Sequence, residues 1–119
     1  MAKEASHRRD VCNYIASKGN TIRAHTADPG TTGASAIGTT PASAPTTWGA
    51  AVDGTGPDAN KAVSTGSGVS LSVPPNTVVT HYSISNGSTF LRGEALTNPI
   101  TVGAGGAVTV DIVPQTKYS

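Results

Sequence analysis

The clearest pattern in the chain is an alternation of apolar and polar residues in its second half. Every second residue is apolar in 69–73 (VSLSV) and again in 108–112 (VTVDI). A period of two is typical of a half-buried β-strand. Residues 78–85, 89–96 and 100–102 are further strand candidates. Turn signals separate these segments, namely Pro74-Pro75-Asn76, Asn86-Gly87, Asn98-Pro99 and Gly103–Gly106.

Short strands at this spacing predict a mainly β protein whose core is an antiparallel β-sandwich of the jelly-roll type. We expect this core in residues 69–119. An N-terminal helix (1–19) and a region of short strands and extended chain (20–68) precede it. All three parts are expected to belong to one domain, since 119 residues leave room for only one.

The first segment has the spacing of a helix instead. Residues 2–18 place five apolar side chains on one narrow stripe, namely Ala5, Val11, Cys12, Ile15 and Ala16. Lys18 then suits the negative end of the helix dipole, and Gly19 stands where a C-cap with positive φ is common. The sequence therefore predicts one α-helix that ends near residue 18.

The middle of the chain, roughly 27–68, is rich in Gly, Pro, Ser, Thr and Ala. Residues 21–26 just before it predict a short strand, 46–52 (TTWGAAV) a second, and 61–65 a weaker third. Asp28-Pro29-Gly30 is a turn signal, because Pro fixes one φ and Gly accepts a positive one. Long loops without structure are uncommon inside a compact domain. We therefore expect an extended arm that is ordered against a neighbouring subunit.

Composition makes the expected core thin. Leu, Ile, Val and Phe supply only 21 of the 119 residues, yet the net charge is only +1 and 13% of the residues are charged. Strong net charge keeps disordered chains open, so this chain should fold. Cys12 is the single cysteine and rules out an internal disulfide. The stability of a small core without disulfides depends on a bound metal or on partner subunits.

Charge is distributed unevenly along the chain. Residues 1–23 hold five basic and two acidic groups, whereas 24–119 hold three basic and five acidic ones. A basic helix beside a mildly acidic body could dock on an acidic neighbour; the alternative is a solvated helix face. Residues 1–23 contain no apolar leader, and no run in the chain reaches the length of a membrane span.

No motif indicates catalysis or a bound cofactor. His7, His25 and His81 lack the short spacing of a metal site, and no cysteine pair accompanies them. No Gly-x-Ser-x-Gly elbow precedes a helix, and the glycine-rich segments lack the lysine of a phosphate loop. We therefore expect no enzyme activity, no metal and no cofactor.

Binding of a polymer has weak support. Basic residues are few and only five aromatic residues occur in the chain, which argues against nucleic acid. A glycan site needs an exposed aromatic ring. Trp48, Tyr82 and Tyr118 are the candidates, although a core role for Trp48 is the competing interpretation.

Three strings resemble a known family. HTADPGTTGAS (25–35), TTWGAAV (46–52) and the block 69–110 are similar to small virion proteins of tailed bacteriophages. The matching features are Trp48-Gly49, Thr80-His81, the hairpin at 88–91 and the last apolar strand at 108–112. In that group a helix feeds a short strand, a turn and then a β-sandwich.

The resemblance implies a structural subunit of the virion, made in the host cytoplasm. A minor tail or tail-tip (baseplate) protein is the preferred role; a capsid decoration protein or a receptor- or glycan-binding module are the alternatives. Expected partners are other virion proteins and further copies of the chain in a trimer or ring, with neither nucleic acid nor membrane. The candidate interface residues are Arg8, Arg9, Pro29, Trp48, His81 and Tyr118.

Overall fold

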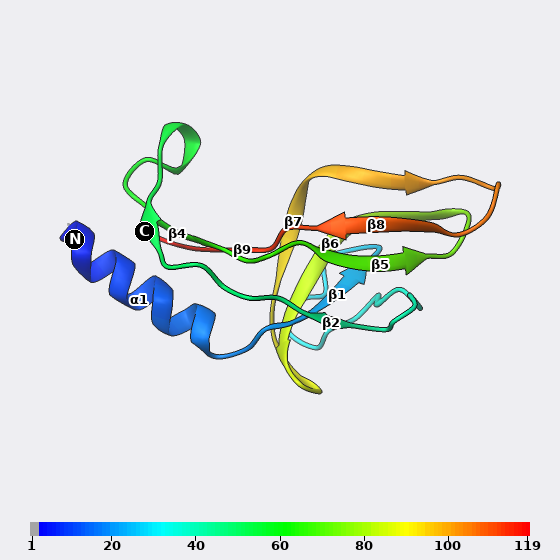
Figure 1. The fold of residues 1–119 in the computed structure, drawn as a ribbon, viewed down its shortest axis with the longest axis horizontal. Helices are drawn as coiled ribbons and strands as arrows, with labels where there is room; N and C mark the ends of the chain where they lie inside the picture. Colours follow the sequence, from blue (N-terminus) through cyan, green and yellow to red (C-terminus); the bar gives the residue numbers. More distant parts are fainter. Residues whose placement is uncertain (1–2) are drawn as a thin grey trace.

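The protein is an elongated molecule with a helix at one end and β-strands along the rest (Figure 1). A computed structural model describes residues 3–119, with extents of 49 × 30 × 23 Å. Its elements are α1 (Ala5–Ser17), β1 (Thr21–His25), β2 (Ala44–Pro45), β3 (Val52–Asp53), the 3-10 turn η1 (Gly56–Asp58), β4 (Ala62–Thr65), β5 (Val69–Val73), β6 (Thr77–Asn86), β7 (Thr89–Val102), β8 (Val108–Ile112) and β9 (Gln115–Tyr118).

The predicted helix is confirmed as α1. The side chain of Glu4 caps its first turn by accepting a hydrogen bond from the backbone N–H of Ser6 at 2.8 Å. At the other end, Gly19 is required for a reason different from the expected one. Its φ is not positive; instead, a Cβ there would lie 2.6 Å from the carbonyl oxygen of Ser85 in β6. Close approach of the helix end to β6 selects this glycine.

The strands form three antiparallel sheets, which confirms the expectation of a mainly β protein. A four-stranded sheet has the order β2-β1-β6-β7, a three-stranded sheet the order β3-β4-β9, and β5 and β8 form a two-stranded sheet. The segments 69–73 and 108–112, which show the clearest alternation, are each other's partners, from Val69↔Ile112 to Val73↔Val108. In Figure 1, this pair lies at the end of the molecule opposite α1.

The predicted strand break at Asn98-Pro99 is wrong. β7 continues through it to Val102, but the ladder with β6 is irregular there: Val79 pairs with Ile100 and His81 with Ala95, so residues 96–99 face only Thr80. The residues that carry the turn signal form a bulge in β7. β7 lies at the edge of its sheet, where a proline removes no essential ladder hydrogen bond.

The segment 46–52 is not the strand that its sequence predicts. Within it, Trp48 forms an isolated bridge with Gly66, and only the last residue, Val52, belongs to a strand, β3. The weaker candidate at 61–65 is confirmed as β4. The last strand, β9, was not predicted; it pairs with β4 along its whole length.

Much of the 27–68 region is folded onto the chain's own body. Ile37 is buried in the main core, and Thr40 forms a bridge with Ser72 of β5. The predicted turn at 28–30 is present: the N–H of Gly30 donates to Asp28 Oδ1 at 2.8 Å, and Gly30 has a φ of 62°. These contacts give the region internal anchors where we had expected an extended arm held by a neighbour.

Two apolar clusters support the fold. The larger cluster joins side chains of the four-stranded and two-stranded sheets. It comprises Ile22, Ala24, Ile37, Val69, Leu71, Val73, Val79, Tyr82, Ile84, Val102, Val110 and Ile112. The smaller cluster comprises Cys12, Ala51 and Ala62, with Tyr118 packed against it. It lies between α1 and the three-stranded sheet, so each end of the molecule has its own core.

Candidate interaction sites

Three of the six predicted interface residues lie at the helical end of the molecule. Arg9 Nη1 forms an ion pair with Asp53 Oδ1 of β3 at 2.8 Å. Arg8 Nη1 donates to the carbonyl of Lys3 at 2.6 Å. The ring of Tyr118 lies under the Lys3 ammonium, 5.5 Å from its centroid. Both arginines are thus partly used in holding α1 and its flanks in place.

Pro29 and His81 lie on the four-stranded sheet but differ in exposure. Pro29 is buried, and its ring covers Gly93 of β7 so closely that a Cβ on Gly93 would clash with Pro29 Cγ and Cδ. His81 in β6 is half-buried, with Nδ1 2.8 Å from Thr80 Oγ1. Pro29 therefore has an internal packing role, while His81 keeps some contact with solvent.

Trp48 lines a groove at the end of α1. The indole is half-buried, and Nε1 donates to the carbonyl of Gly19 at 2.9 Å, which fixes the ring. The groove has a volume of about 450 Å³ and lies between the end of α1 and the sheet. Its lining is mostly polar and comprises Ala16, Ser17, Lys18, Gly19, Asn20, Thr46, Thr47, Trp48 and Asn86.

His25 and Ser83 form a buried polar pair that the sequence did not indicate. His25 Nδ1 lies 2.8 Å from the carbonyl oxygen of Ala34, and Nε2 lies 2.8 Å from Ser83 Oγ. Because a carbonyl only accepts, Nδ1 carries the proton in the neutral ring and Nε2 accepts from the serine hydroxyl. Burial lowers the pKa of His25, and the positive charge of Arg23 adds to this.

The same pair has the donor and acceptor arrangement of a serine–histidine dyad. However, His25 and Ser83 are each only 1% exposed. A nucleophile must reach its substrate, so this geometry supports no reaction. What the pair does is connect β1, β6 and the loop that contains Ala34.

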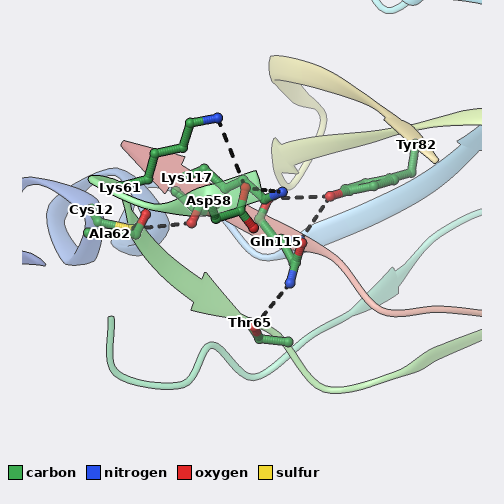
Figure 2. Close-up of polar contacts among 9 residues, drawn as sticks. Cys12, Asp58, Lys61, Ala62, Thr65, Tyr82, Gln115 and Lys117 are labelled. Carbon is green, nitrogen blue, oxygen red and sulfur yellow. Dashed lines mark hydrogen bonds and ion pairs between the residues drawn. The ribbon is translucent and has the colours of Figure 1, made fainter. Parts of the chain in front are cut away.

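A second polar cluster connects the two ends of the molecule (Figure 2). The backbone N–H of Gln115 donates to the hydroxyl of Tyr82 at 2.8 Å, and that hydroxyl lies 3.3 Å from the Gln115 carbonyl. Tyr82 is buried, which raises the pKa of its hydroxyl. Nearby, the Cys12 thiol donates to the carbonyl of Thr116 at 3.2 Å, and burial raises the pKa of that thiol. β9 is therefore held by side chains from both cores.

Arg92 and Glu94 of β7 were not among the predicted site residues. Arg92 is half-buried and Nη2 donates to Thr116 Oγ1 at 2.5 Å; burial lowers the pKa of its guanidinium. Glu94 is exposed. Within residues 3–119, the ion pairs involve only Arg9, Lys61 and Lys117 as cations, so neither Arg92 nor Glu94 has an ionic partner. In the sequence, only the opposite charges of these two residues, on either side of Gly93, could have indicated them as a site.

Between Lys3 and Ser119, no group of three or more His, Cys, Asp or Glu side chains is arranged to hold a metal ion. In the same part of the chain, no helix is long and apolar enough to cross a membrane.

Comparisons with protein-family models, curated proteins and solved structures find no match for this chain.

Proposed function

We propose that this protein is a structural subunit of a bacteriophage virion, specifically a minor tail or tail-tip protein that acts by packing against other proteins. The observation that carries the packing role is the open edge of β7. This strand is 14 residues long, ends its sheet, and has only β6 beside it. Open edges are templates for pairing with another chain, and Arg92–Ala95 is the regular part of this edge, between its two bulges. The virion setting rests on the sequence resemblance.

The division of the core into two small clusters supports the same role. Val52, Val108 and Val113 are 60%, 50% and 55% exposed, so large apolar side chains remain outside both clusters. Burial of such side chains against a partner removes apolar surface from water, which stabilises the assembly. Within the subunit, we propose that the two-stranded and four-stranded sheets act as the layers of a small β-sandwich around the larger cluster.

The mass of the purified protein in solution tests this proposal. We expect light scattering to detect a dimer, trimer or ring whose population rises with protein concentration. Immunogold labelling of particles of the encoding phage should then mark the tail tip. Labelling of the head surface would favour a capsid decoration protein instead. A chain that stays monomeric at every concentration and is missing from the particles would contradict the proposal.

A receptor- or glycan-binding module is the second candidate, and the groove at Trp48 favours it. The groove is within the size range of small-molecule sites, and combines a fixed aromatic ring with the amide side chains of Asn20 and Asn86. Sugars present an apolar face to such a ring and hydroxyl groups to amides. Binding of a glycan panel that is lost in Trp48→Ala, but kept in the exposed-site control Tyr14→Phe, would support it.

A further inference from the structure

We infer that β7 pairs with β7 of a second copy of this chain, antiparallel and around a two-fold axis at Gly93, so that Arg92 of each copy faces Glu94 of the other. This inference rests on the proposed packing role and specifies its partner and register. It goes beyond that role because it names the residues that select the partner.

The backbone of β7 is available for such pairing. Its ladder is formed with β6 alone, on one side. In the described part of the chain, no other segment makes a backbone hydrogen bond to residues 89–102. The second edge therefore carries free N–H and C=O groups, and these are strong hydrogen-bonding groups that need partners when covered.

Two irregularities limit where a second copy can add. Ile84 pairs with Arg92 but Ser85 pairs with Phe90, so Leu91 has no partner in β6. Towards the C-terminal end of β7, the bulge at 96–99 interrupts the ladder with β6 again. Between them, the regular stretch of β7 is Arg92–Ala95. A bulge bends its strand and disrupts pairing, so regular strand addition is confined to this short stretch.

Charge then selects the register within the stretch. A two-fold axis at Gly93 places the residue before it opposite the residue after it in the partner strand. Arg92 therefore faces the partner's glutamate and Glu94 the partner's arginine, with opposite Cβ atoms about 4.5–5.5 Å apart. An axis at Glu94 would set two carboxylates against each other, and an axis at Arg92 two guanidinium groups. Like charges directly opposite are destabilising.

Arg92 and Glu94 lie on the same face of the sheet, as their pairing across the two-fold axis requires. Arg92 pairs with Ile84 and Glu94 with Tyr82, and alternate residues of a strand share one face. Arg92 is half-buried, donates to Thr116 Oγ1 and feels the charge of Glu94 in its own strand, but forms no close ion pair within residues 3–119. Attraction between opposite charges is stronger near a protein interface than in bulk water, because the effective dielectric constant is lower there. Two reciprocal pairs would give all four charged groups of the dimer a partner.

Charge reversal of the two residues tests the register. In E94R, each interface position brings two arginines together, and in R92E two glutamates. We expect each variant alone to dimerise at least about tenfold more weakly than the natural chain. A one-to-one mixture of the two variants should recover dimers, because a chain with two acidic residues then faces one with two basic residues. Analytical ultracentrifugation measures all three samples.

The matched controls are D10R and K18E, which make the same charge changes on α1 and should leave dimerisation unchanged. Glu94 is exposed, so E94R should fold; circular dichroism verifies this for both variants, and E94Q replaces R92E if that variant unfolds. E94Q should weaken dimerisation less than E94R does. Folded variants that assemble like the natural chain would overturn the β7 register but leave the packing role. A natural chain without any self-association would overturn this inference, while its presence in particles would still support the proposed function.

Discussion

Among single residues, His25 has the most tightly defined protonation state. Its ring donates to the Ala34 carbonyl and accepts from Ser83, an arrangement that only the neutral form with hydrogen on Nδ1 can make. Burial is the main cause of its lowered pKa, and Arg23 and His81 are the titratable groups that add to it. Protonation would reverse the bond to Ser83, with Nε2–H donating to the hydroxyl oxygen, and would place a charge on a side chain that is only 1% exposed.

We predict that acidification destabilises the protein through His25. The pKa is lowered in the folded state, so the unfolded state binds more protons below the ordinary value of 6.5. Stability should be complete above that pH and fall as the pH decreases from it towards the folded-state pKa. Thermal melts between pH 8 and pH 5 measure this. The loss should be smaller in His25→Gln and unchanged in His7→Gln; equal losses in all three proteins would refute the assignment to His25.

At the scale of elements, α1 is an integral part of the fold. Cys12 and Ala16 are its buried residues, with exposed fractions of 0% and 4%. They face the three-stranded sheet, where the Cys12 thiol reaches the backbone of β9 (Figure 2). The ion pair between Arg9 and Asp53 is exposed and adds little, because surface ion pairs contribute about 0–1 kcal/mol. Packing at Cys12 and Ala16 is what holds the helix.

Labelling of the Cys12 thiol should report undocking of α1. The thiol is fully buried, so Ellman's reagent should react with it only when the helix opens, and much more slowly than with the urea-unfolded chain. Ala16→Asp places a carboxylate in the same interface, and we expect at least about tenfold faster labelling, since burying an unpaired polar group costs about 1–3 kcal/mol. Ser17→Asp, on the exposed side, is the control. Fast labelling of the natural protein would contradict the packing of α1.

At the scale of the whole molecule, two small cores are joined by few contacts. Tyr82 belongs to the larger cluster, and its hydroxyl holds the backbone of Gln115 at the start of β9, which pairs with β4 beside α1. Arg92 reaches Thr116 in the same strand. These bonds fix the two ends of the molecule relative to each other. Because they all end on β9, this strand should be the element most sensitive to their loss.

Tyr82→Phe should therefore lower the free energy of unfolding by about 1–2 kcal/mol, because two backbone groups of Gln115 lose their partner. Urea denaturation measures the change. Hydrogen exchange should become faster in β4, β9 and α1 before it does in β5 and β8. Tyr14 is 64% exposed, so Tyr14→Phe should change neither quantity. If hydrogen exchange became faster to the same extent along the whole chain, the two ends of the molecule would unfold as one unit.

The sequence alone determined the elements whose pattern is local. Alternation identified β5 and β8 with their observed bounds, and helical spacing identified α1. These predictions succeed because the side-chain period of a strand or helix depends on its own backbone geometry. The same reasoning failed at 46–52, where Trp48 makes only an isolated bridge to Gly66, and at β9, whose four residues are too few to show a period.

Tertiary structure alone decided which segments meet. Nothing local indicates that β5 pairs with β8, that Pro29 covers Gly93, or that Gly19 is needed to clear Ser85. It also brought His25 to Ser83 and left Arg92 and Glu94 on an open edge. Such contacts join residues far apart in the chain, and they depend on the closure of the whole fold, which a period of two or of 3.6 residues does not encode.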